Sequence, residues 1–375
     1  MKTAAYTLDS GDLDRQLAEI RREHPEPVLV IFSSPPACMD EVTDGVYRWF
    51  PNCDSMGMIG AGMHDGLLTD TDVVLTLVTA DAEVRCGVIP DLKACPVHNV
   101  HDVEQNLWAL DGTETDTVCL EFCTGNEETL VTVLNSVLRY RKISLAGATA
   151  FPVDGSALKV ACNGRVYEDA CVYAFIRNTW GRILVLRESA FEKAGRERYQ
   201  ATEVDSGNHC LKKLDGQRAL DVYEAGVGKD GEALARETFR HPLGRIVGDA
   251  VFTTDIREID DNGWIHTYKR ISRNDFFYLL KLVDYRKVFR QSCQRIKASL
   301  GHIDGVFTLE CVSRRRLFEA EDCMDEYLRA YERLGPHSGI STGGEQCGNQ
   351  HMNNTLVYVV FEDCKWEEWE CGKID

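Results

Sequence analysis

The chain alternates between amphipathic segments with helical spacing and short apolar runs that predict buried strands. After the capping candidates Asp9 and Ser10, the residues Leu13, Leu17 and Ile20 fall on one helical face. Further helical or amphipathic segments are predicted over residues 38–50, 100–110, 126–140, 217–225, 231–238, 274–300 and 317–334. Strands are predicted over residues 27–33, 72–79, 82–89, 117–122, 143–145, 246–252, 305–309 and 356–361. This alternation predicts an α/β or α+β protein, two-lobed, with mixed sheets covered by helices.

Two local sequence patterns predict a hairpin and a domain boundary. Asn163-Gly164 is the strongest hairpin signal in the sequence, and it predicts that two strands within residues 158–186 are joined by a tight turn. The stretch from Arg187 to Asp215 is rich in charge and glycine and has the weakest pattern, so a domain boundary is expected there. No exact short-period repeat is present in the sequence.

Length and charge narrow the class of protein. A chain of 375 residues with 44% apolar content can bury at least two cores, because single cores stop growing near ~250–300 residues. The net charge of −18 argues against nucleic acid and against an anionic membrane as partners. No apolar run reaches the roughly 18 residues that span a bilayer. The first residues have no apolar segment typical of a signal peptide, so we expect a cytoplasmic protein.

The cysteines indicate a reducing compartment. The chain has 15 of them, and they are scattered through strand and helix patterns as small buried apolar residues. There is no Cys-x-x-Cys pair. The spacing of Cys95, His98 and His101 is the nearest approach to a metal motif, but structural zinc usually needs a second pair of ligands. A plain loop before a helix remains the alternative for this segment.

Glycine-rich turns follow several of the predicted strands. The turn at residues 57–66 does not match a dinucleotide-binding fingerprint, because its glycines are wrongly spaced. A second turn lies at residues 145–150, and a third, polar run at residues 339–355 precedes the last strand. Glycines at a strand end let backbone N–H groups approach a bound molecule closely. The sequence contains neither a phosphate-binding GxxxxGK[ST] loop nor a GxSxG elbow.

These turns and several further segments, in this order, resemble the FIST proteins, which combine a FIST N-terminal and a FIST C-terminal domain. The resemblance covers residues 26–362 and is carried by the opening strand at 27–33, the turns at 57–62 and 146–150, and the segments 216–223, 241–244, 311–314, 341–345 and 353–355. It implies an N-terminal domain over residues 26–215, a C-terminal domain over 216–362 and an acidic tail over 363–375.

The resemblance is closer in the second half of the chain. Met63 stands where the first turn of the family ends in glutamate, and the Cys-Ser-Thr of that turn is replaced by Met58, Ile59 and Gly60. In the C-terminal run, Met352 occupies a position that is often histidine, and His351 is displaced by one residue. We therefore expect most ligand contacts in the C-terminal lobe or in the cleft between the lobes.

The family implies a non-enzymatic sensory protein. Such a protein binds a small molecule, for which amino acids have been suggested, and passes the change to a separate signalling protein such as a histidine kinase or a cyclic-dinucleotide enzyme. Some members bind haem, sense nitric oxide and act through a histidine kinase. A cytoplasmic sensor of an amino acid or a similar metabolite is therefore the primary hypothesis, and a haem-binding nitric-oxide sensor is the alternative.

The C-terminal run holds the candidate ligand site. Glu345 is placed to pair with a ligand ammonium, while the N–H groups of Gly343 and Gly344 and the guanidinium of Arg314 are placed to hold a carboxylate. The set of candidate ligand-binding residues is Thr342, Gly343, Gly344, Glu345, Arg314, Asn353 and Thr355. The alternative is structural: these side chains tie a tight turn together, and Arg314 is an exposed or ion-paired arginine.

Other readings of the same residues stay open. Haem needs an accessible axial ligand, and His241, His351 and His64 are the candidates in that order. Cys311 follows a strand and has Arg314 nearby, so a Cys-dependent hydrolase is a second alternative. A protein that binds partners without any small ligand is a third. The acidic tail with its two tryptophans is either a docking strip or a frayed end.

Overall fold

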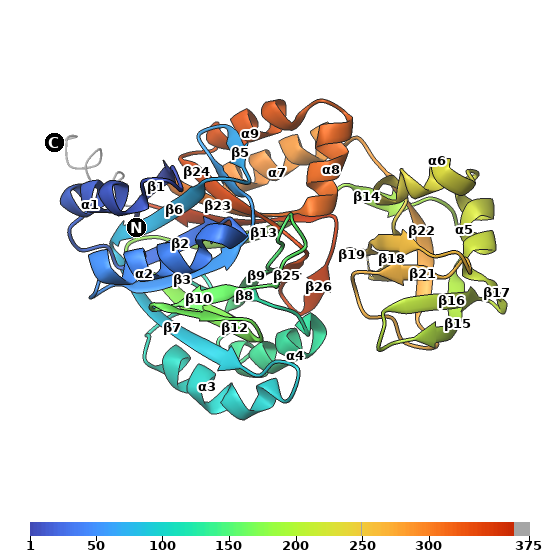
Figure 1. Ribbon diagram of the computed structural model, residues 1–375, viewed down its shortest axis with the longest axis horizontal. Coiled ribbons are helices and arrows are strands. Elements are labelled where there is room, and N and C mark those ends of the chain that lie inside the picture. Colours follow the sequence, from blue (N-terminus) through green and yellow to red (C-terminus); the bar gives the residue numbers. More distant parts are fainter. Residues whose placement is uncertain (249, 364–375) are drawn as a thin grey trace.

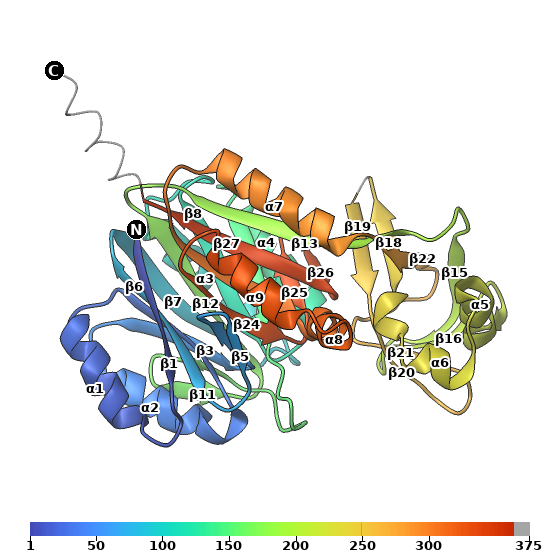
Figure 2. The same ribbon diagram turned by 90° about the horizontal axis from the view of Figure 1, so that it is seen from above.

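The computed structural model describes residues 1–248 and 250–363. The acidic tail predicted over residues 363–375 therefore lies outside the described residues from position 364 onward. The molecule consists of a large body and a smaller lobe beside it, as seen in Figure 1 and, from above, in Figure 2. Residues 191–282 form the lobe, and the segments before and after them form the body. The two lobes in space are thus not two consecutive halves of the chain.

The body contains three units of the same topology among the described residues. Each has an edge strand, helical cover, a parallel strand pair with a helical crossover, a hairpin and a long final strand. The first unit contains β1 (Lys2–Leu8), α1 (Leu13–Glu23), β2 (Leu29–Ser34), η1 (Pro36–Cys38), α2 (Met39–Trp49), β3 (Asp54–Ile59), β4 (Gly62–His64), β5 (Leu67–Thr69) and β6 (Val73–Ala80).

The second unit follows directly along the chain. It contains β7 (Ala82–Pro90), η2 (Pro96–Asn99), α3 (Val100–Trp108), β8 (Thr117–Cys123), α4 (Glu127–Leu138), β9 (Ser144–Thr149), β10 (Val160–Cys162), β11 (Arg165–Tyr167) and β12 (Ala170–Asn178). The third unit is interrupted by the lobe. It contains β13 (Ile183–Ser189), α7 (Tyr285–Ser299), β23 (Ile303–Cys311), α8 (Val312–Ala320), α9 (Met324–Glu332), β24 (His337–Thr342), β25 (Glu345–Cys347), β26 (Gln350–Met352) and β27 (Thr355–Glu362).

The three units exchange their hairpins. Within each unit one strand pair is parallel, namely β2 with β3, β8 with β9 and β23 with β24. Parallel pairs need a crossover, and the crossover helices cover the outer faces of the sheets. The first strand of each following hairpin then joins the sheet of another unit, so that β4 pairs with β24, β10 with β3 and β25 with β9. This exchange interlocks the three sheets of the body.

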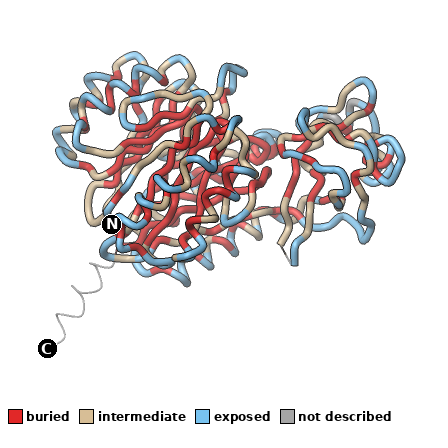
Figure 3. The backbone as a smooth tube through the Cα atoms, turned by 90° about the horizontal axis from the view of Figure 1, so that it is seen from below, coloured by how far each residue is buried: buried red, intermediate tan, exposed pale blue. Residues whose placement is uncertain are grey.

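The interlocked sheets share one core. Side chains from all three sheets meet there, among them Ile31, Leu120 and Leu309, which are almost fully buried. The outer face of each sheet packs against its own helices in a separate cluster. The buried backbone fills the middle of the body in Figure 3. Because the central strands are covered on both faces, their sequences are continuous apolar runs rather than alternating ones.

The lobe has its own sheet and core. It contains β14 (Phe191–Lys193), β15 (Tyr199–Asp205), β16 (Cys210–Leu214), β17 (Gln217–Arg218), α5 (Ala219–Val227), α6 (Gly231–Ala235), η3 (Thr238–Arg240), β18 (Leu243–Val247), β19 (Ala250–Thr254), β20 (Ile256–Ile259), β21 (Ile265–Thr267) and β22 (Phe276–Leu282). Leu211, Tyr223 and Phe277 pack in its interior. The two connections to the body touch where Val283 N–H donates to the Ala190 carbonyl at 2.9 Å. The two chain connections between the lobe and the body therefore lie side by side.

The α/β prediction is confirmed, and so is the Asn163-Gly164 hairpin, where both residues have positive φ angles of 46° and 79°.

The helical prediction over residues 274–300 is wrong in its first part. Residues 276–282 pair with β18 as strand β22, and α7 begins only after Asp284, whose side chain caps it by accepting from Lys287 N–H at 3.0 Å. The helix predicted over 317–334 is two helices, α8 and α9, separated at Asp322 with φ 51°. No helix of the described residues is long and apolar enough to cross a membrane.

Candidate functional site

The three glycine-rich turns of the sequence meet at one place in the structure. They lie at the carboxyl ends of β3, β9 and β24, the second strands of the three parallel pairs. The turn predicted over residues 145–150 is wrong in this detail, because residues 145–149 belong to β9 itself. Phe151 N–H donates to the Ile59 carbonyl at 3.0 Å, and Ser341 N–H donates to the Ala61 carbonyl at 2.8 Å. A Cβ atom on Gly60 would lie 2.8 Å from the Ser341 carbonyl oxygen, so the close approach of Gly60 to Ser341 requires glycine. The carboxyl ends of parallel strands, where α/β proteins commonly bind ligands, therefore converge here.

Glu345 lies in this convergence and has no exposed surface. Its carboxyl group accepts hydrogen bonds from the hydroxyls of Thr342, at 2.5 Å, and Thr355, at 2.6 Å. Burial raises the pKa of Glu345 to about 8. The structure thus brings together three of the predicted site residues, and a ligand ammonium reaches Glu345 only after a rearrangement that uncovers it.

Arg314 belongs to a neighbouring network and does not contact Glu345. Its Nη2 lies 2.8 Å from Glu188 Oε1, and its Nε lies 3.4 Å from Glu310 Oε1. All three side chains are buried. The hydroxyl of Tyr358 donates to Glu188 at 3.1 Å, and the hydroxyl of Tyr331 donates to Glu310 at 3.2 Å. The guanidinium is therefore held by two internal carboxylates.

Asn353 and Asn354 lie where the lobe rests on the body. The Thr253 hydroxyl donates to the Asn353 carbonyl, and Asn354 Nδ2 donates to the Phe239 carbonyl at 2.8 Å. Asn353 Nδ2 also reaches the Gly343 carbonyl at 3.4 Å, so the glycine run is tied to the same junction. The amide side chains are completely buried.

Several buried polar atoms at this junction have no hydrogen-bond partner among the described residues. They are Asn353 Oδ1, Asn354 Oδ1, Asp255 Oδ2 and Thr254 Oγ1. Unpartnered buried polar atoms are rare in proteins and often mark functional or rearranging regions. Burial raises the pKa of Asp255 to about 6. Burial also lowers the pKa of Lys269 to about 8, and the Lys269 ammonium donates to the His351 carbonyl at 2.5 Å.

A cleft of about 690 Å³ opens between the body and the lobe. The body contributes the end of β13 and one face of α7, and the lobe contributes Phe191 and the start of β19. The polar residues that line it are Arg187, Glu188, Ser189, Gln291, Ser292, Gln294 and Arg295. This volume suits a small metabolite, since ligand pockets typically measure roughly 300–1,000 Å³.

Arg187 is the most unusual group of the cleft. It is half-buried, and burial lowers its pKa. Its guanidinium lies 4.8 Å from the centre of the Phe252 ring, and Nη1 approaches the Val251 carbonyl at 3.3 Å and Met352 Sδ at 3.2 Å. It makes no ion pair with any carboxylate of the described residues. The buried hydroxyl of Ser189 also lacks a partner among them. These groups are suited to hold an anionic ligand group.

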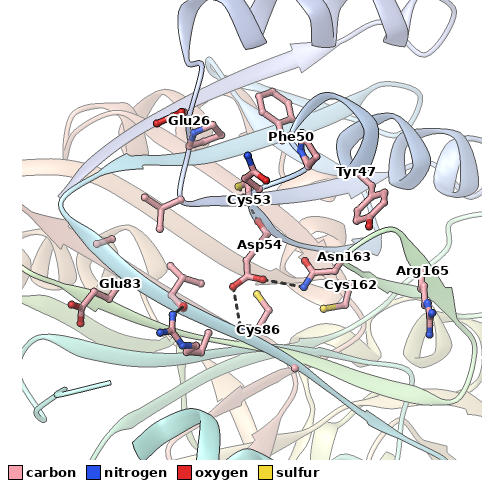
Figure 4. Close-up of a pocket in the computed structure, with 18 of the residues that line it drawn as sticks. Glu26, Tyr47, Phe50, Cys53, Asp54, Glu83, Cys86, Cys162, Asn163 and Arg165 are labelled. Carbon is pink, nitrogen blue, oxygen red and sulfur yellow. Dashed lines mark hydrogen bonds between the residues drawn. The ribbon is translucent and has the colours of Figure 1, made fainter. Parts of the chain in front are cut away.

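Two further cavities lie in the first two units. The larger, of about 1130 Å³, is a groove between β7 and the strands β3, β10 and β11, and Figure 4 shows its lining. The smaller, of about 450 Å³, lies over the carboxyl ends of β2 and β3 beside the turn at Gly60 and Ala61. Its lining includes Pro35, Pro36 and Phe151, so it is more apolar than the cleft beside the lobe.

The histidines proposed as haem ligands lie apart from the three cavities described above. His351 is buried, its Nδ1 lies 2.9 Å from Gln346 Nε2, and burial lowers its pKa to about 3. His64 and His241 are half-buried on separate elements, with His64 Nδ1 3.1 Å from the Thr7 hydroxyl. None of the three lines the cleft, the groove or the smaller cavity.

Two other sites considered from the sequence are a metal cluster and a cysteine nucleophile. Among residues 1–248 and 250–363, no group of three His, Cys, Asp or Glu side chains is placed to hold a metal ion. Cys311, at the end of β23, is 1% exposed. Burial, with the neighbouring carboxyl groups of Glu345 and Asp255, raises its pKa well above the usual range. A raised pKa lowers the fraction of the reactive thiolate at neutral pH.

The sequence did not indicate Arg187, Ser189 or Arg295 as functional residues. Arg187 and Ser189 fall at the edge of the segment read as a boundary, and Arg295 falls in a predicted helix. They come together only because the lobe is inserted between β13 and α7. A short polar Arg-Glu-Ser sequence at the end of an apolar strand was the only local signal.

Comparison with known protein families identifies the chain. The FIST N domain matches residues 27–217, and the FIST C domain matches residues 219–348. A comparison with curated proteins finds no match. The matched residues cover most of the chain, so the protein belongs to the FIST family. FIST domains are associated with small-ligand sensing in signal transduction.

Proposed function

We propose that this protein is a sensor whose ligand, an amino acid or a similar metabolite with a carboxylate, binds in the cleft between the body and the lobe. The observation that carries this proposal is Arg187, a half-buried guanidinium without a carboxylate partner among the described residues, at the edge of a cleft of about 690 Å³. A partly desolvated cation gains more from a ligand anion than an exposed one does, because water screens it less.

The groups around Arg187 complete a site for such a ligand. Ser189 offers a hydroxyl without a partner in the described chain, and Arg295 adds a second cation on the facing helix α7. The amide oxygens of Gln291 and Gln294 on the same helix can accept hydrogen bonds from an ammonium group. The site is thus suited to a small molecule that carries both a carboxylate and a hydrogen-bond donor.

Binding in this cleft provides a route to a signal. The ligand would touch the body through β13 and α7 and the lobe through β19, and the two chain connections to the lobe lie side by side. Closure around such a hinge is a common response to ligands. Glu188, next to Arg187 in β13, is bonded to Arg314, so the cleft adjoins the buried network beneath it. The output would be read by a separate signalling protein such as a histidine kinase or a cyclic-dinucleotide enzyme, without catalysis by this chain.

The buried C-terminal run remains the competing location for the ligand. Glu345, Thr342 and Thr355 are bonded to one another, and the unpartnered amide oxygens of Asn353 and Asn354 lie beside them at the junction with the lobe. A ligand could displace these contacts only if the lobe moved away. The two locations make different predictions for single variants.

A thermal-shift screen of amino acids and related carboxylates tests the proposal. A ligand at 100 times its dissociation constant adds about 2.7 kcal/mol to the free energy of unfolding, which gives a clear rise in melting temperature. Arg187→Met keeps the apolar stem of the side chain but removes the charge, and we expect it to weaken binding about 10- to 100-fold, the worth of a lost charged hydrogen bond. Arg257→Met is the matched control, because Arg257 is a lobe arginine that does not line the cleft.

The outcomes separate the two locations. Loss of the shift in Arg187→Met, with the shift retained in Arg257→Met and in Glu345→Gln, supports the cleft. Retention in Arg187→Met and loss in Glu345→Gln would place the ligand in the buried run instead. A panel without any stabilising carboxylate would contradict the proposed ligand class.

A further inference from the structure

The groove in the first two units is walled by strands from two different sheets. One wall is β7, the edge strand of its sheet, and the other is formed by the sheet that contains β3 and the exchanged hairpin β10–β11. Cys53, Cys86 and Cys162 line this groove of about 1130 Å³. No role in ligand sensing follows from these thiols, and they lie in a different part of the body from the cleft beside the lobe.

Cys86 and Cys162 face each other across the two walls. The Asp54 carboxylate accepts a hydrogen bond from each of the two strands. Cys86 N–H donates to Asp54 Oδ2 at 3.4 Å, and Nδ2 of Asn163, the residue after Cys162, donates to Asp54 Oδ1 at 2.9 Å. Cα atoms of β7 and β10 approach within 8 Å, and both cysteines line the same groove. Figure 4 shows both thiols close to the Asp54 carboxylate. A disulfide usually joins Cα atoms about 4.4–6.8 Å apart, so the bridge needs Cys86 and Cys162 at the close end of this approach.

We propose that Cys86 and Cys162 are a reversible redox site, at which a hydroperoxide oxidises the pair to a disulfide across the groove. Cys86 is partly exposed and lines the groove, whereas Cys162 is 5% exposed, so the oxidant meets Cys86 first. Cys162 then acts as the resolving thiol. The bridge joins β7 to the exchanged hairpin and so fastens two of the interlocked sheets to each other.

The chemistry balances with the hydroperoxide as the only oxidant. The Cys86 sulfur attacks one peroxide oxygen, the S–O bond forms, the O–O bond breaks, and an alcohol (or water, from hydrogen peroxide) leaves with the thiol proton. The Cys162 sulfur then attacks the Cys86 sulfur, the S–S bond forms, the S–O bond breaks, and water leaves with the second thiol proton. Two thiols are oxidised by two electrons, and one peroxide is reduced. A small dithiol reverses the reaction by thiol–disulfide exchange.

The environment sets the rate of the first step. Contact with Cys162 and burial raise the pKa of the Cys86 thiol well above its usual range. The thiolate is the reactive form, so oxidation at neutral pH is slow and becomes faster as the pH rises. The second step does not depend on diffusion, because the resolving thiol is already in place.

Peptide mapping of the full-length protein tests the proposal. The protein is treated with tert-butyl hydroperoxide, blocked with an alkylating reagent and digested without reduction. We expect a cross-linked peptide pair that contains Cys86 and Cys162, lighter by two hydrogen atoms than the free pair and released by dithiothreitol. Cys86→Ser and Cys162→Ser each remove this species. Cys53→Ser is the matched control, because Cys53 lines the same groove and should leave the bridge intact.

Two results would overturn the inference. One is a wild-type map in which both cysteines remain alkylated after treatment at pH 8.5. The other is a map in which Cys86 is converted to sulfinic acid or joined to Cys53 while Cys162 stays free. The wild-type map decides the question by itself, so a variant that fails to fold does not leave it open.

Discussion

Replacement of Arg314 by methionine tests the buried ion network beneath the cleft. The guanidinium lies 2.8 Å from a Glu188 oxygen and 3.4 Å from a Glu310 oxygen, and all three side chains are buried. Methionine keeps the length and apolar contact of the side chain but leaves two carboxyl groups buried without their counter-charge. Removing one partner of a buried ion pair costs about 3–5 kcal/mol, so we expect the free energy of unfolding at pH 8 to fall by that amount.

Burial, rather than the number of ion pairs, sets this magnitude. Exposed pairs are worth about 0–1 kcal/mol, because water screens them. Arg329 on α9 provides the comparison, since its side chain is 70% exposed and lies 3.9 Å from Asp325. Arg329→Met should therefore change the free energy of unfolding by less than about 1 kcal/mol. Burial raises the pKa of Glu310, so its carboxyl group is protonated readily, and the loss in Arg314→Met should be smaller at pH 5 than at pH 8.

Urea unfolding followed by circular dichroism measures these differences. Wild type, Arg314→Met and Arg329→Met are compared at pH 5 and pH 8, with the double variant Arg314→Met/Glu188→Gln as a recovery test. The double variant should regain part of the lost stability, because one uncompensated carboxylate is removed. A loss below about 1 kcal/mol in Arg314→Met at pH 8, equal to that of the exposed control, would refute the reasoning.

Three further predictions address the convergence of turns and the core. Burial raises the pKa of Glu345 from 4.5 to about 8, so the folded state binds more protons than the unfolded state between these pH values. The melting temperature should therefore fall as the pH rises from 5 to 8, and Glu345→Gln should flatten this slope. Gly60→Ala places a Cβ atom 2.8 Å from the Ser341 carbonyl, and urea unfolding should show a loss of about 1–3 kcal/mol. Leu309→Ala in the shared core should cost about 2–5 kcal/mol, whereas Leu67→Ala, at a side chain 64% exposed, should stay within about 0.5 kcal/mol.

Periodicity predicted those elements whose burial pattern follows from local sequence. The strand at residues 27–33 and the hairpin at Asn163-Gly164 were found because apolar runs and turn residues carry their own signals. The run Phe276–Leu282 was read as helical, since an apolar stretch of this length does not distinguish helix from strand. Its strand character comes from pairing with β14, β15 and β18 of the lobe, which are distant in sequence.

The repetition of the three units was not visible in the sequence. The units share the order of their strands, the exchange of hairpins and one glycine-rich segment, but no longer residue pattern, and the third is interrupted by the lobe. The insertion of the lobe into the third unit also decides which site residues could be predicted from the sequence. The run around Glu345 is contiguous and was found by composition, whereas Arg187 and Arg295 line one cleft only because the chain returns from the lobe.

Hydrogen–deuterium exchange of the full chain, with and without the most stabilising carboxylate of the thermal screen, tests the central claim most directly. The account predicts slower exchange at the end of β13 (Ile183–Ser189), on α7 and at the start of β19, the three elements that enclose the cleft. Arg187→Met should abolish this protection at the same ligand concentration. Protection confined to residues 341–355, with β13, α7 and β19 unchanged, would contradict a ligand in the cleft.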